Sequence, residues 1–427
     1  MSTNQFDMSL TEISALFKIK YEKLSENVYN SSNVLLGRCK KSYNFVGEKM
    51  VIAIPQSFAG GVGSGSLPKA NKAKYGKAEI TAKKLYARVQ VDRETIKAAS
   101  KDEGSFVRAT KEVVKKGVES YMRNLSRILF SDSDQSGGGA LAKGDNTTNV
   151  SGTGSTADPF IVSLEEASFK EANLEEQDLV NIEGETTNLE IIAVDASSTV
   201  KTISLVGTSA ELAAKADVAN NGTAQHSPSP TSKKIFMQGS EDKDPTGLGE
   251  ALKSAASGSL YSINRDRKWS STEVAASSAS ISTDLLNKVM LQVEKKCGKA
   301  PNLLVCSYEQ YEKILNILED QKRYEVKTRA GLKSKSGADI SFSGIEFMST
   351  SGPVGIFPDR FADKDTVYAL NDNQIHIHHR PDFGWFDDDG TVFMRLADED
   401  AYEARYGGYL EIYVNPAFHG RITGLAV

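Results

Sequence analysis

The sequence predicts an α+β protein that carries a small inserted β-domain. One long helical pattern, with apolar residues spaced three and four apart, covers Gly104 to Phe130. A region that mixes helix and strand patterns begins at Ser282, and short strand patterns rich in turn residues lie between the two. A chain that combines one long helix, a strand-rich stretch and a region of helices and strands is assigned to the α+β class.

The helix from Gly104 to Phe130 is predicted to lie across a core and to present a basic outer surface. At about 100° per residue, its apolar and basic side chains separate into two faces. The apolar face contains Val107, Val114, Val118, Tyr121, Leu125, Ile128 and Leu129. The basic face contains Arg108, Lys111, Lys115, Lys116, Arg123 and Arg127. A solvated charged face is the simpler interpretation, and a face turned toward a polyanion is the alternative.

The N-terminal region predicts an arm followed by a hairpin. Leu10 to Leu36 has an amphipathic helical pattern but is too short to form a core, so it must pack on something else. Met50 to Asp92 has the pattern of two strands that flank a glycine-rich connector. Because its tip has no apolar residues to bury, this long hairpin is expected to project from its parent domain.

The glycine-rich stretch Phe58 to Leu67, FAGGVGSGSL, follows an apolar run and therefore raises the question of phosphate binding. A P-loop needs a lysine and a hydroxyl residue directly after its last glycine, but Gly65 is followed by Ser66 and Leu67. The dinucleotide-binding pattern GxGxxG is not met either, because Ser66 occupies the position of its third glycine. A strand-like alternation from Lys77 to Val91 follows where a helix is required, so nucleotide binding is disfavoured.

The inserted β-domain is predicted from a change of composition. Ser131 to Pro159 is rich in Gly, Ser, Asp, Asn and Thr, which marks a linker or long loop. Asp178 to Val206 then shows short strands broken by turn residues, the pattern of a small β-barrel or β-sandwich. A second polar stretch, Asn220 to Lys234, closes or decorates this insert.

The C-terminal part predicts a second core. Ser282 caps a helix that ends at Gly298, PNLLVCS from Pro301 is a buried strand, and another helix follows from Tyr308. The later strand patterns are Val367 to His379, Thr391 to Leu396 and Tyr409 to Val414.

Composition and charge exclude several classes of protein. A chain of 427 residues has room for two or three domains, and its net charge of −5 does not fit a polycation that coats DNA. Cys39, Cys297 and Cys306 are too scattered for a disulfide framework or a CxxC zinc site, and they suit a reducing compartment. The absence of a signal-peptide pattern and of an apolar run of about 18 residues predicts a soluble protein made in the cytosol.

Two polar clusters are candidates for a metal site. His376 and His378 would share one face of a strand that ends at His379, with Asp382 near in sequence, but no second ligand cluster supports a metal. An exposed strand of polar residues is therefore favoured. The segment Asp387 to Gly390, DDDG, lacks both ends of an EF-hand loop and favours an Asp-Gly hairpin turn between its flanks.

No catalytic constellation is visible. The sequence has no GxSxG elbow, and no cysteine has a histidine nearby in sequence. We therefore expect no enzyme activity, no catalytic residues and no cofactor.

Taken in order, several segments resemble the major capsid proteins of tailed bacteriophages, which have the Hong Kong 97 fold. Val28 to Lys41, VYNSSNVLLGRCKK, resembles the end of the family's N-terminal arm. Gly60 to Phe130 then has the family's order of a glycine-rich extended loop, an LP step, a strand ending in LYARVQV, and IKAA and GSFVRA at the start of the spine helix.

Three later segments extend the resemblance. In Gly247 to Val274 the family's Leu-Tyr, Ile, Arg and Trp places are held by Tyr261, Ile263, Arg265 and Trp269. PNLLVCSYEQYEKILNIL resembles the strand and helix of the axial domain, and GYLEIYVNPAFHGRITGL resembles the returning strand of the peripheral domain.

The resemblance implies a division of the chain into six segments. They are the N-terminal arm (1–43), the extended loop with its flanking strands (44–92), the peripheral domain with the spine helix (93–133), the inserted β-domain with flexible linkers (134–244), a return to the peripheral domain (245–281), and the axial domain with the final peripheral strands (282–427).

The function that the resemblance implies is self-assembly, as hexamers and pentamers, into an icosahedral shell that encloses double-stranded DNA. The implied partners are other copies of the chain, a portal protein, a scaffolding protein, DNA bound without sequence specificity and, in some family members, a maturation protease or decoration protein. The protein is expected in the virion, after assembly in the host cytoplasm. A cellular nanocompartment shell that packages a cargo enzyme is the alternative, and a nucleotide-dependent enzyme is a more distant one.

Contacts between subunits are predicted from opposite charges at two places. The segment from Lys69 to Arg88 is basic, and the segment from Asp382 to Glu403 is acidic. If the extended hairpin of one subunit crosses the acidic segment of its neighbour, these charges would steer docking. The predicted contact residues are Lys69, Lys72, Lys74, Lys77, Asp387, Asp388 and Asp389. Two merely solvated patches are the simpler alternative.

Some family members also join subunits by a lysine to asparagine isopeptide bond. Asn371, Asn373 and Asn415 lie late in the chain, but none of them forms a match to that motif with a lysine of the extended loop.

Overall fold

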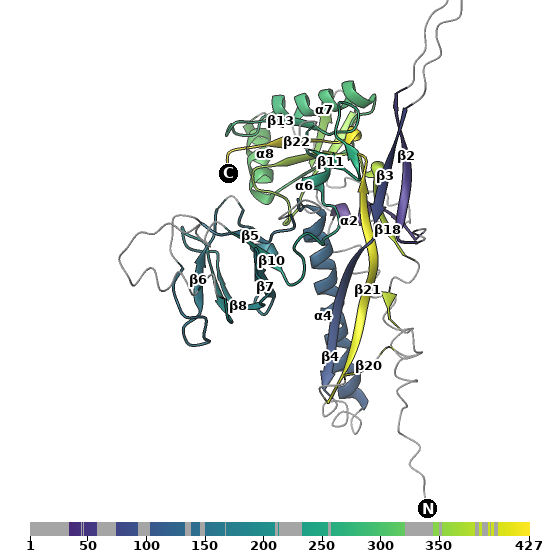
Figure 1. Cartoon of the computed structure of the whole chain (residues 1–427). Coiled ribbons are helices and arrows are strands. Elements are labelled where there is room, and N and C mark those ends of the chain that lie inside the picture. Colours follow the sequence, from purple (N-terminus) through teal and green to yellow (C-terminus); the bar gives the residue numbers. More distant parts are fainter. Residues whose placement is uncertain are drawn as a thin grey trace, which may run out of the picture. The chain divides into compact units, whose positions relative to one another are not determined.

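The fold is seen in a computed structural model of the whole chain (Figure 1). The residues that it describes are 34–43, 45, 47–57, 74–92, 103–132, 138–145, 150–166, 168–209, 212, 233–254, 258–320, 345–349, 352–380, 384–386, 392, 394–396 and 400–427. The predicted arm helix before residue 34, the glycine-rich loop at 58–73 and the polar stretch up to 232 lie outside them.

The chain divides into two compact units. The first is formed by 1–51, 79–126 and 375–413, and the second by 52–78, 127–374 and 414–427. Each unit therefore combines segments that lie far apart in the sequence.

The first unit is built on a six-stranded sheet whose centre is the long strand β21 (Ala401–Val414). Its path is β1 (Lys40–Ser42), β18 (Ile375–His379), β21 and β19 (Gly384–Trp385), and β20 (Met394–Arg395) and β4 (Lys83–Asp92) also pair with β21. The antiparallel register of β4 runs from Asp92 opposite Ala401 to Lys83 opposite Leu410. Gly407 lies within this pairing with φ +143, where a Cβ would come 2.2 Å from the Leu85 carbonyl oxygen, so only glycine fits there.

The predicted long helix is confirmed as α4 (Glu103–Leu129). The apolar side chains at Val118, Tyr121, Leu125, Ile128 and Leu129 are buried. Tyr121 packs edge-on against Tyr406 of β21, with ring centroids 5.3 Å apart.

The helix also approaches β4 closely. A Cβ at Gly117 would lie 2.4 Å from Val89 Cγ2. Glycine at this position therefore lets the helix backbone come near the strand.

The predicted basic face of α4 is only partly correct. Lys115 and Lys116 are exposed, and Lys115 pairs with Glu119 at 3.5 Å, one helical turn on. The prediction that Arg127 belongs to the exposed basic face is wrong, because its side chain is only 4% exposed and pairs with Asp244 at 3.3 Å. A buried guanidinium needs such a partner, and position on a helical wheel does not reveal one that is distant in sequence.

The second unit contains a second six-stranded sheet. Its order is β13 (Thr272–Ala275), β22 (Gly420–Thr423), β17 (Val367–Leu370), β14 (Leu303–Cys306), β16 (Gly352–Pro358) and β15 (Ile345–Ser349). The predicted buried strand is confirmed as β14, which is buried at every residue because it lies between β17 and β16.

Two helices accompany this sheet, α7 (Thr283–Cys297) and α8 (Tyr308–Asp320). The predicted ends of α7 are confirmed. Ser282 Oγ accepts a hydrogen bond from the Leu285 amide at 3.3 Å, and Gly298 ends the helix with φ 74, the left-handed conformation typical of a helix C-terminus.

Between α4 and α7 the chain forms a small β-barrel. The strands β5 (Ala142–Lys143), β6 (Phe160–Ser163), β7 (Leu179–Ile182), β8 (Leu189–Asp195), β9 (Thr202–Val206) and β10 (Lys234–Met237) have the order β5-β10-β7-β8-β9-β6. A bridge between Gly144 and Leu164 joins the two ends and closes the sheet. The strands predicted within Asp178 to Val206 are confirmed as β7, β8 and β9, and the closure favours the barrel over the sandwich.

The barrel has a hydrophobic core of its own. Its largest members include Phe160, Phe169, Ile191 and Leu205, and it shares no residue with the core beneath the second sheet. The two cores are therefore separate packing units within the second unit.

The segment that carries the resemblance around Tyr261 is a buried junction. Arg265 is fully buried and donates to Glu250 Oε1 at 2.7 Å and to the carbonyl oxygens of Glu250 and Ala251 in α6 (Leu248–Ala251). The Tyr261 hydroxyl accepts from the Val414 amide at 3.2 Å. These bonds fix the start of the returning chain against α6 and the end of β21.

The two neighbouring residues of this segment are buried as well. Trp269 donates its indole N–H to the Leu260 carbonyl at 3.3 Å, and Ile263 is 6% exposed. The four residues singled out by the resemblance are thus structural.

The predicted exposed strand of histidines is wrong. In β18, His378 is 6% and His379 1% exposed, because this strand lies between β1 and β21. Burial lowers the pKa of His378 to about 4 and that of His379 to about 3. These rings are therefore held neutral near pH 7.

His419, which lies in the second unit, is also buried and neutral. It is fully buried, and its Nδ1 accepts a hydrogen bond from the Asn371 amide at 3.1 Å. Burial lowers the pKa of His419 to about 3. An acceptor Nδ1 must be unprotonated, so the hydrogen bond and the low pKa agree.

We expect Leu125→Ala to lower the free energy of unfolding by about 2–5 kcal/mol, because it removes a fully buried side chain and leaves a cavity. Lys116→Ala, at an exposed position of the same helix, is the matched control and should change it by less than about 0.5 kcal/mol. Urea unfolding of both variants checks this. Equal losses would contradict the assignment of the two faces.

We expect His419→Gln to reduce the loss of stability in acid. The unfolded ring titrates near pH 6.5 and the folded ring near 3. As pH falls through that window, the unfolded state gains a proton that the folded state lacks, so the free energy of unfolding drops by about 1.4 kcal/mol per pH unit. Urea unfolding between about pH 7.5 and pH 4.5 should show a shallower slope for the variant. Identical slopes would show that His419 does not cause this pH dependence of the free energy of unfolding.

Candidate assembly surfaces

The residues that the structure describes contain no group of three His, Cys, Asp or Glu side chains that could hold a metal ion. Within the same residues, no helix has the length and apolarity needed to cross a bilayer. The three cysteines are not disulfide-bonded.

The predicted hairpin strands are β2 (Lys49–Ser57) and β3 (Lys74–Thr81), which form a two-stranded sheet with no third strand among the described pairings. Val51 is 57% and Tyr75 56% exposed. Among the residues of β2 and β3 whose burial the structure describes, only Ala78 and Ile80, near the end of β3, are buried. The hairpin therefore has little core of its own, as expected for a projecting element.

Lys74 and Lys77 lie on the exposed part of β3. An ion pair of this hairpin joins Lys49 and Glu79 at 3.3 Å, with both side chains about half exposed. Lys69 and Lys72 fall outside the described residues. The structure thus brings two of the predicted contact lysines together on one exposed strand.

The other basic residues of this segment belong to a different sheet. The chain breaks pairing at Ala82, and β4 then pairs with β21 of the same chain, so the single strand predicted from Lys77 to Val91 is wrong. Arg88 hydrogen-bonds Glu403, a carboxylate that is 1% exposed and also accepts from Arg405. The hydrogen bond from Arg88 lowers the pKa of Glu403.

This pairing was missed because β21 is much longer than the strand predicted from Tyr409 to Val414. Charge order alone assigned Arg88 and Glu403 to different subunits, whereas the structure joins them within one chain.

The acidic residues Asp387, Asp388 and Asp389 lie outside the described residues, but their flanks are placed. Gly384 of β19 pairs with Gly407, and Met394 of β20 pairs with Glu403, both antiparallel to β21. The two flanks thus follow one another along a single partner strand. The predicted hairpin turn is therefore wrong. The two flanks run in the same direction along β21, whereas the two strands of a hairpin are antiparallel to each other.

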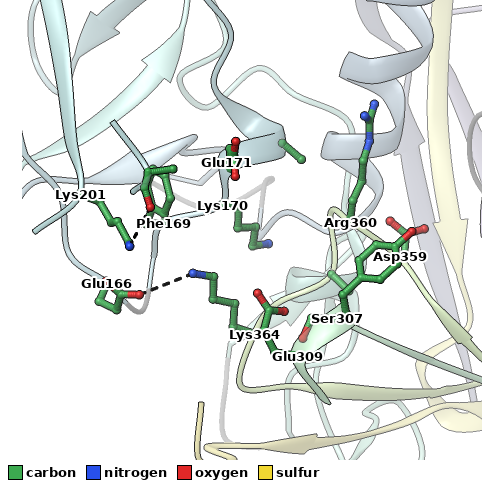
Figure 2. A pocket seen from close by; sticks show the side chains of 14 residues that line it. Glu166, Phe169, Lys170, Glu171, Lys201, Ser307, Glu309, Asp359, Arg360 and Lys364 are labelled. Atoms are coloured by element: carbon green, nitrogen blue, oxygen red, sulfur yellow. Dashed lines mark hydrogen bonds and ion pairs between the residues drawn. The ribbon is translucent and has the colours of Figure 1, made fainter. Parts of the chain in front are cut away.

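A polar groove lies between the barrel and the segment 359–364 (Figure 2). Its volume is about 270 Å³. From the barrel, Lys170 donates to the Phe361 carbonyl at 3.0 Å and pairs with Asp363. From the opposite side, Lys364 pairs with Glu166 at 3.7 Å and lies 5.4 Å from the centre of the Phe169 ring. Sequence patterns gave no sign of this contact.

The insert also differs in charge from the rest of the chain. Residues 138–244 contain 17 acidic and 7 basic residues, a net charge of −10. Since the whole chain carries −5, the remaining residues carry a net +5. The negative charge of the protein is thus concentrated in its insert.

These features are typical of a structural protein. It has a framework of buried residues, an exposed two-stranded hairpin and a separately packed, acidic barrel. A model of the family described as SU10 major capsid protein matches residues 231–426. That range contains the second sheet, α6, α7, α8 and β21. Comparison with curated proteins found no match.

Comparison with solved structures gives matches that cover most of the chain at low sequence identity. The Cyanophage A-1(L) capsid asymmetric unit is 11% identical, covers 93% of this chain and 94% of that chain, and gives a TM-score of 0.46. The capsid of the native GTA particle is 9% identical, with 93% and 91% covered and a TM-score of 0.42. Mycobacterium phage Adephagia is 12% identical, with 99% of each chain covered and a TM-score of 0.39.

The family match over residues 231–426 confirms the resemblance predicted from the sequence, and the function that it supports is that of a major capsid protein of tailed bacteriophages. The predicted α+β fold of the Hong Kong 97 type is confirmed with it. As a capsid protein, the chain is a component of the virion and associates with copies of itself.

Proposed function

We propose that the chain assembles as hexamers and pentamers into an icosahedral shell that encloses double-stranded DNA. The observation that carries this proposal is the hairpin β2–β3, whose strands expose Val51, Tyr75, Lys74 and Lys77. A hairpin that buries so little is marginal by itself, and packing against a neighbouring subunit would stabilise it. The work of the protein is then mechanical, with no reaction catalysed.

The proposed contact is electrostatic in part. Lys69, Lys72, Lys74 and Lys77 of one subunit would face Asp387, Asp388 and Asp389 of its neighbour. Lys83, Lys84 and Arg88 are left out of this contact, because β4 uses them within its own chain: Lys84 lies over the Tyr409 ring and Arg88 binds Glu403. Single exposed pairs contribute about 0–1 kcal/mol, so repetition around a ring of subunits is what gives them weight.

The barrel is proposed to face away from the packaged DNA. A net charge of −10 on the insert would be repelled by phosphates, while the remaining chain with +5 would not. The six-segment division of the chain given above, with an axial and a peripheral domain, belongs to the same proposal. The same proposal includes four kinds of partner, which are a portal protein, a scaffolding protein, a protease and a decoration protein. It also includes assembly in the host cytoplasm.

The decisive experiment is electron microscopy of native particles combined with nuclease treatment. Closed icosahedral shells with nuclease-protected DNA would support the proposal. Shells that contain a protein cargo and no DNA would support the nanocompartment instead. Monodisperse subunits that never form rings or shells, at any protein concentration or salt, would contradict it.

We expect the triple variant Lys72→Glu, Lys74→Glu, Lys77→Glu to fold normally by circular dichroism but to assemble poorly. Reversed charges on the hairpin would repel the acidic segment of the neighbour, and salt screens such fields over about 8–10 Å. Particle yield by sedimentation at low salt measures the effect.

The control for this variant is Lys115→Glu with Lys116→Glu, two exposed lysines on α4. Reversal of Asp387, Asp388 and Asp389 to Lys should partly restore assembly of the triple variant. A particle yield equal to that of the unchanged chain would eliminate the electrostatic contact and leave the capsid function standing.

A further inference from the structure

A buried guanidinium joins both connections of the barrel to α4. The Arg127 guanidinium, at the end of α4, donates to the Gly139 carbonyl at 3.2 Å and to Asp244 Oδ2 at 3.3 Å. Gly139 lies just before the first barrel strand and Asp244 lies after the last one, so both connections of the barrel are bound to the same cation. Ser240 also donates to Asp244 at 2.6 Å.

A second contact lies away from these connections, at the groove of Figure 2, and it is ionic. Lys170 reaches from the barrel to Asp363 and the Phe361 carbonyl, and Lys364 reaches back to Glu166. The two lysine side chains are 13% and 16% exposed, whereas Asp363 is 34% and Glu166 57% exposed. The acidic ends of both pairs are therefore in reach of water.

The groups that make this contact are each fixed on their own side. Phe169, between the two barrel contact residues, is part of the barrel core at 2% exposure. On the other side, Asp359 Oδ1 accepts from the Phe361 amide at 2.9 Å, and the Tyr368 hydroxyl binds Asp363. The contact thus joins two preorganised surfaces, each supported by a separate core.

Charged and apolar side chains both border the contact, and Phe169, Ala196 and Tyr308 are among the latter. The groove of about 270 Å³ is lined by further charged side chains, among them Glu171, Lys201, Glu309 and Arg360. Because the barrel core and the sheet core share no residue, separating these surfaces would break ion pairs and leave both cores intact.

We propose that the Lys170–Asp363 and Lys364–Glu166 pairs form a latch that holds the barrel against segment 359–364, and that the barrel swings about its Arg127 anchor when the latch opens. The opening requires no unfolding of the barrel or of the sheet. It is favoured by salt and by loss of either lysine charge. A subunit that must fit different neighbours could thereby present its barrel at more than one angle, a consequence that rests on the proposed function, whereas the latch itself does not.

The test is amide hydrogen exchange of the full-length, unassembled chain, followed by mass spectrometry. The probes are the amides of Phe169 and Asn173 on the barrel side and of Ala362 and Thr366 on the other, all of which are hydrogen-bonded within their own segments. Strand β8, in the barrel core, is the internal reference.

In the variant Lys170→Met with Lys364→Met, exchange at these probes should be about 5-fold faster or more, while β8 stays unchanged. Methionine keeps most of the apolar stem and removes the ammonium group, with its charge and its hydrogen bonds. The unchanged chain in about 1 M salt should show the same pattern without any substitution.

The matched control is Lys143→Met, which removes an ion pair of similar kind, Lys143 with Glu165 at 3.2 Å, that lies wholly within the barrel. It should leave the probes at segment 359–364 unchanged. The exchange of charges Lys364→Glu with Glu166→Lys should restore slow exchange relative to Lys364→Glu alone.

Two outcomes would overturn the proposal. Unchanged exchange at all four probes, in the double variant and in high salt, would show that the pairs do not hold the barrel. Faster exchange that extends through β8 would show that the contact is part of the barrel's own stability and that no swing without unfolding exists.

Discussion

The antiparallel pairing of β4 with β21 is the constraint on which the first unit depends. It joins residues 83–92 to residues 401–410, so that contacts such as Arg88 with Glu403 are 315 positions apart in the sequence. All other strands of that sheet are bound directly or through β18 to β21. The sheet therefore cannot be completed until both ends of the chain are present, and the entropy of closing so long a loop is lost in that step.

The second unit lies largely within that closed loop, and two buried guanidinium groups organise it. Arg127 binds both connections of the barrel, and Arg265 binds Glu250 and the carbonyl oxygens of α6. Burying such a charge is costly unless it is paired and hydrogen-bonded, so each arginine favours the arrangement of segments that supplies its partners. The contacts of these two arginines therefore specify where the segments lie more than they stabilise the fold.

Local patterns in the sequence predicted the elements that local forces determine. The helix α4, the capped helix α7 and the buried strand β14 follow from periodicity and from Ser282 and Gly298 at the helix ends. The order of motifs identified the fold family, because that order is set along the chain.

Errors arose where a distant partner decides the environment. Arg127 lies on a helical face with five other basic residues, yet Asp244 draws it into the interior. His378 and His379 have polar side chains, yet β1 and β21 enclose their strand. The latch residues Lys170 and Lys364 carry no local pattern at all, since each is defined only by a group on the opposite side of the groove.

The physical state of the hairpin β2–β3 explains why this chain would assemble. Its strands pair only with each other among the described residues, and both expose apolar side chains at Val51 and Tyr75. An isolated two-stranded hairpin is at best marginally stable in water, and its outer edges offer unpaired N–H and C=O groups. Lysines at Lys74 and Lys77 oppose indiscriminate pairing, because like charges repel when two identical edges approach. An acidic neighbouring surface removes that repulsion, so the same lysines that keep free subunits apart would select the correct contact in the shell.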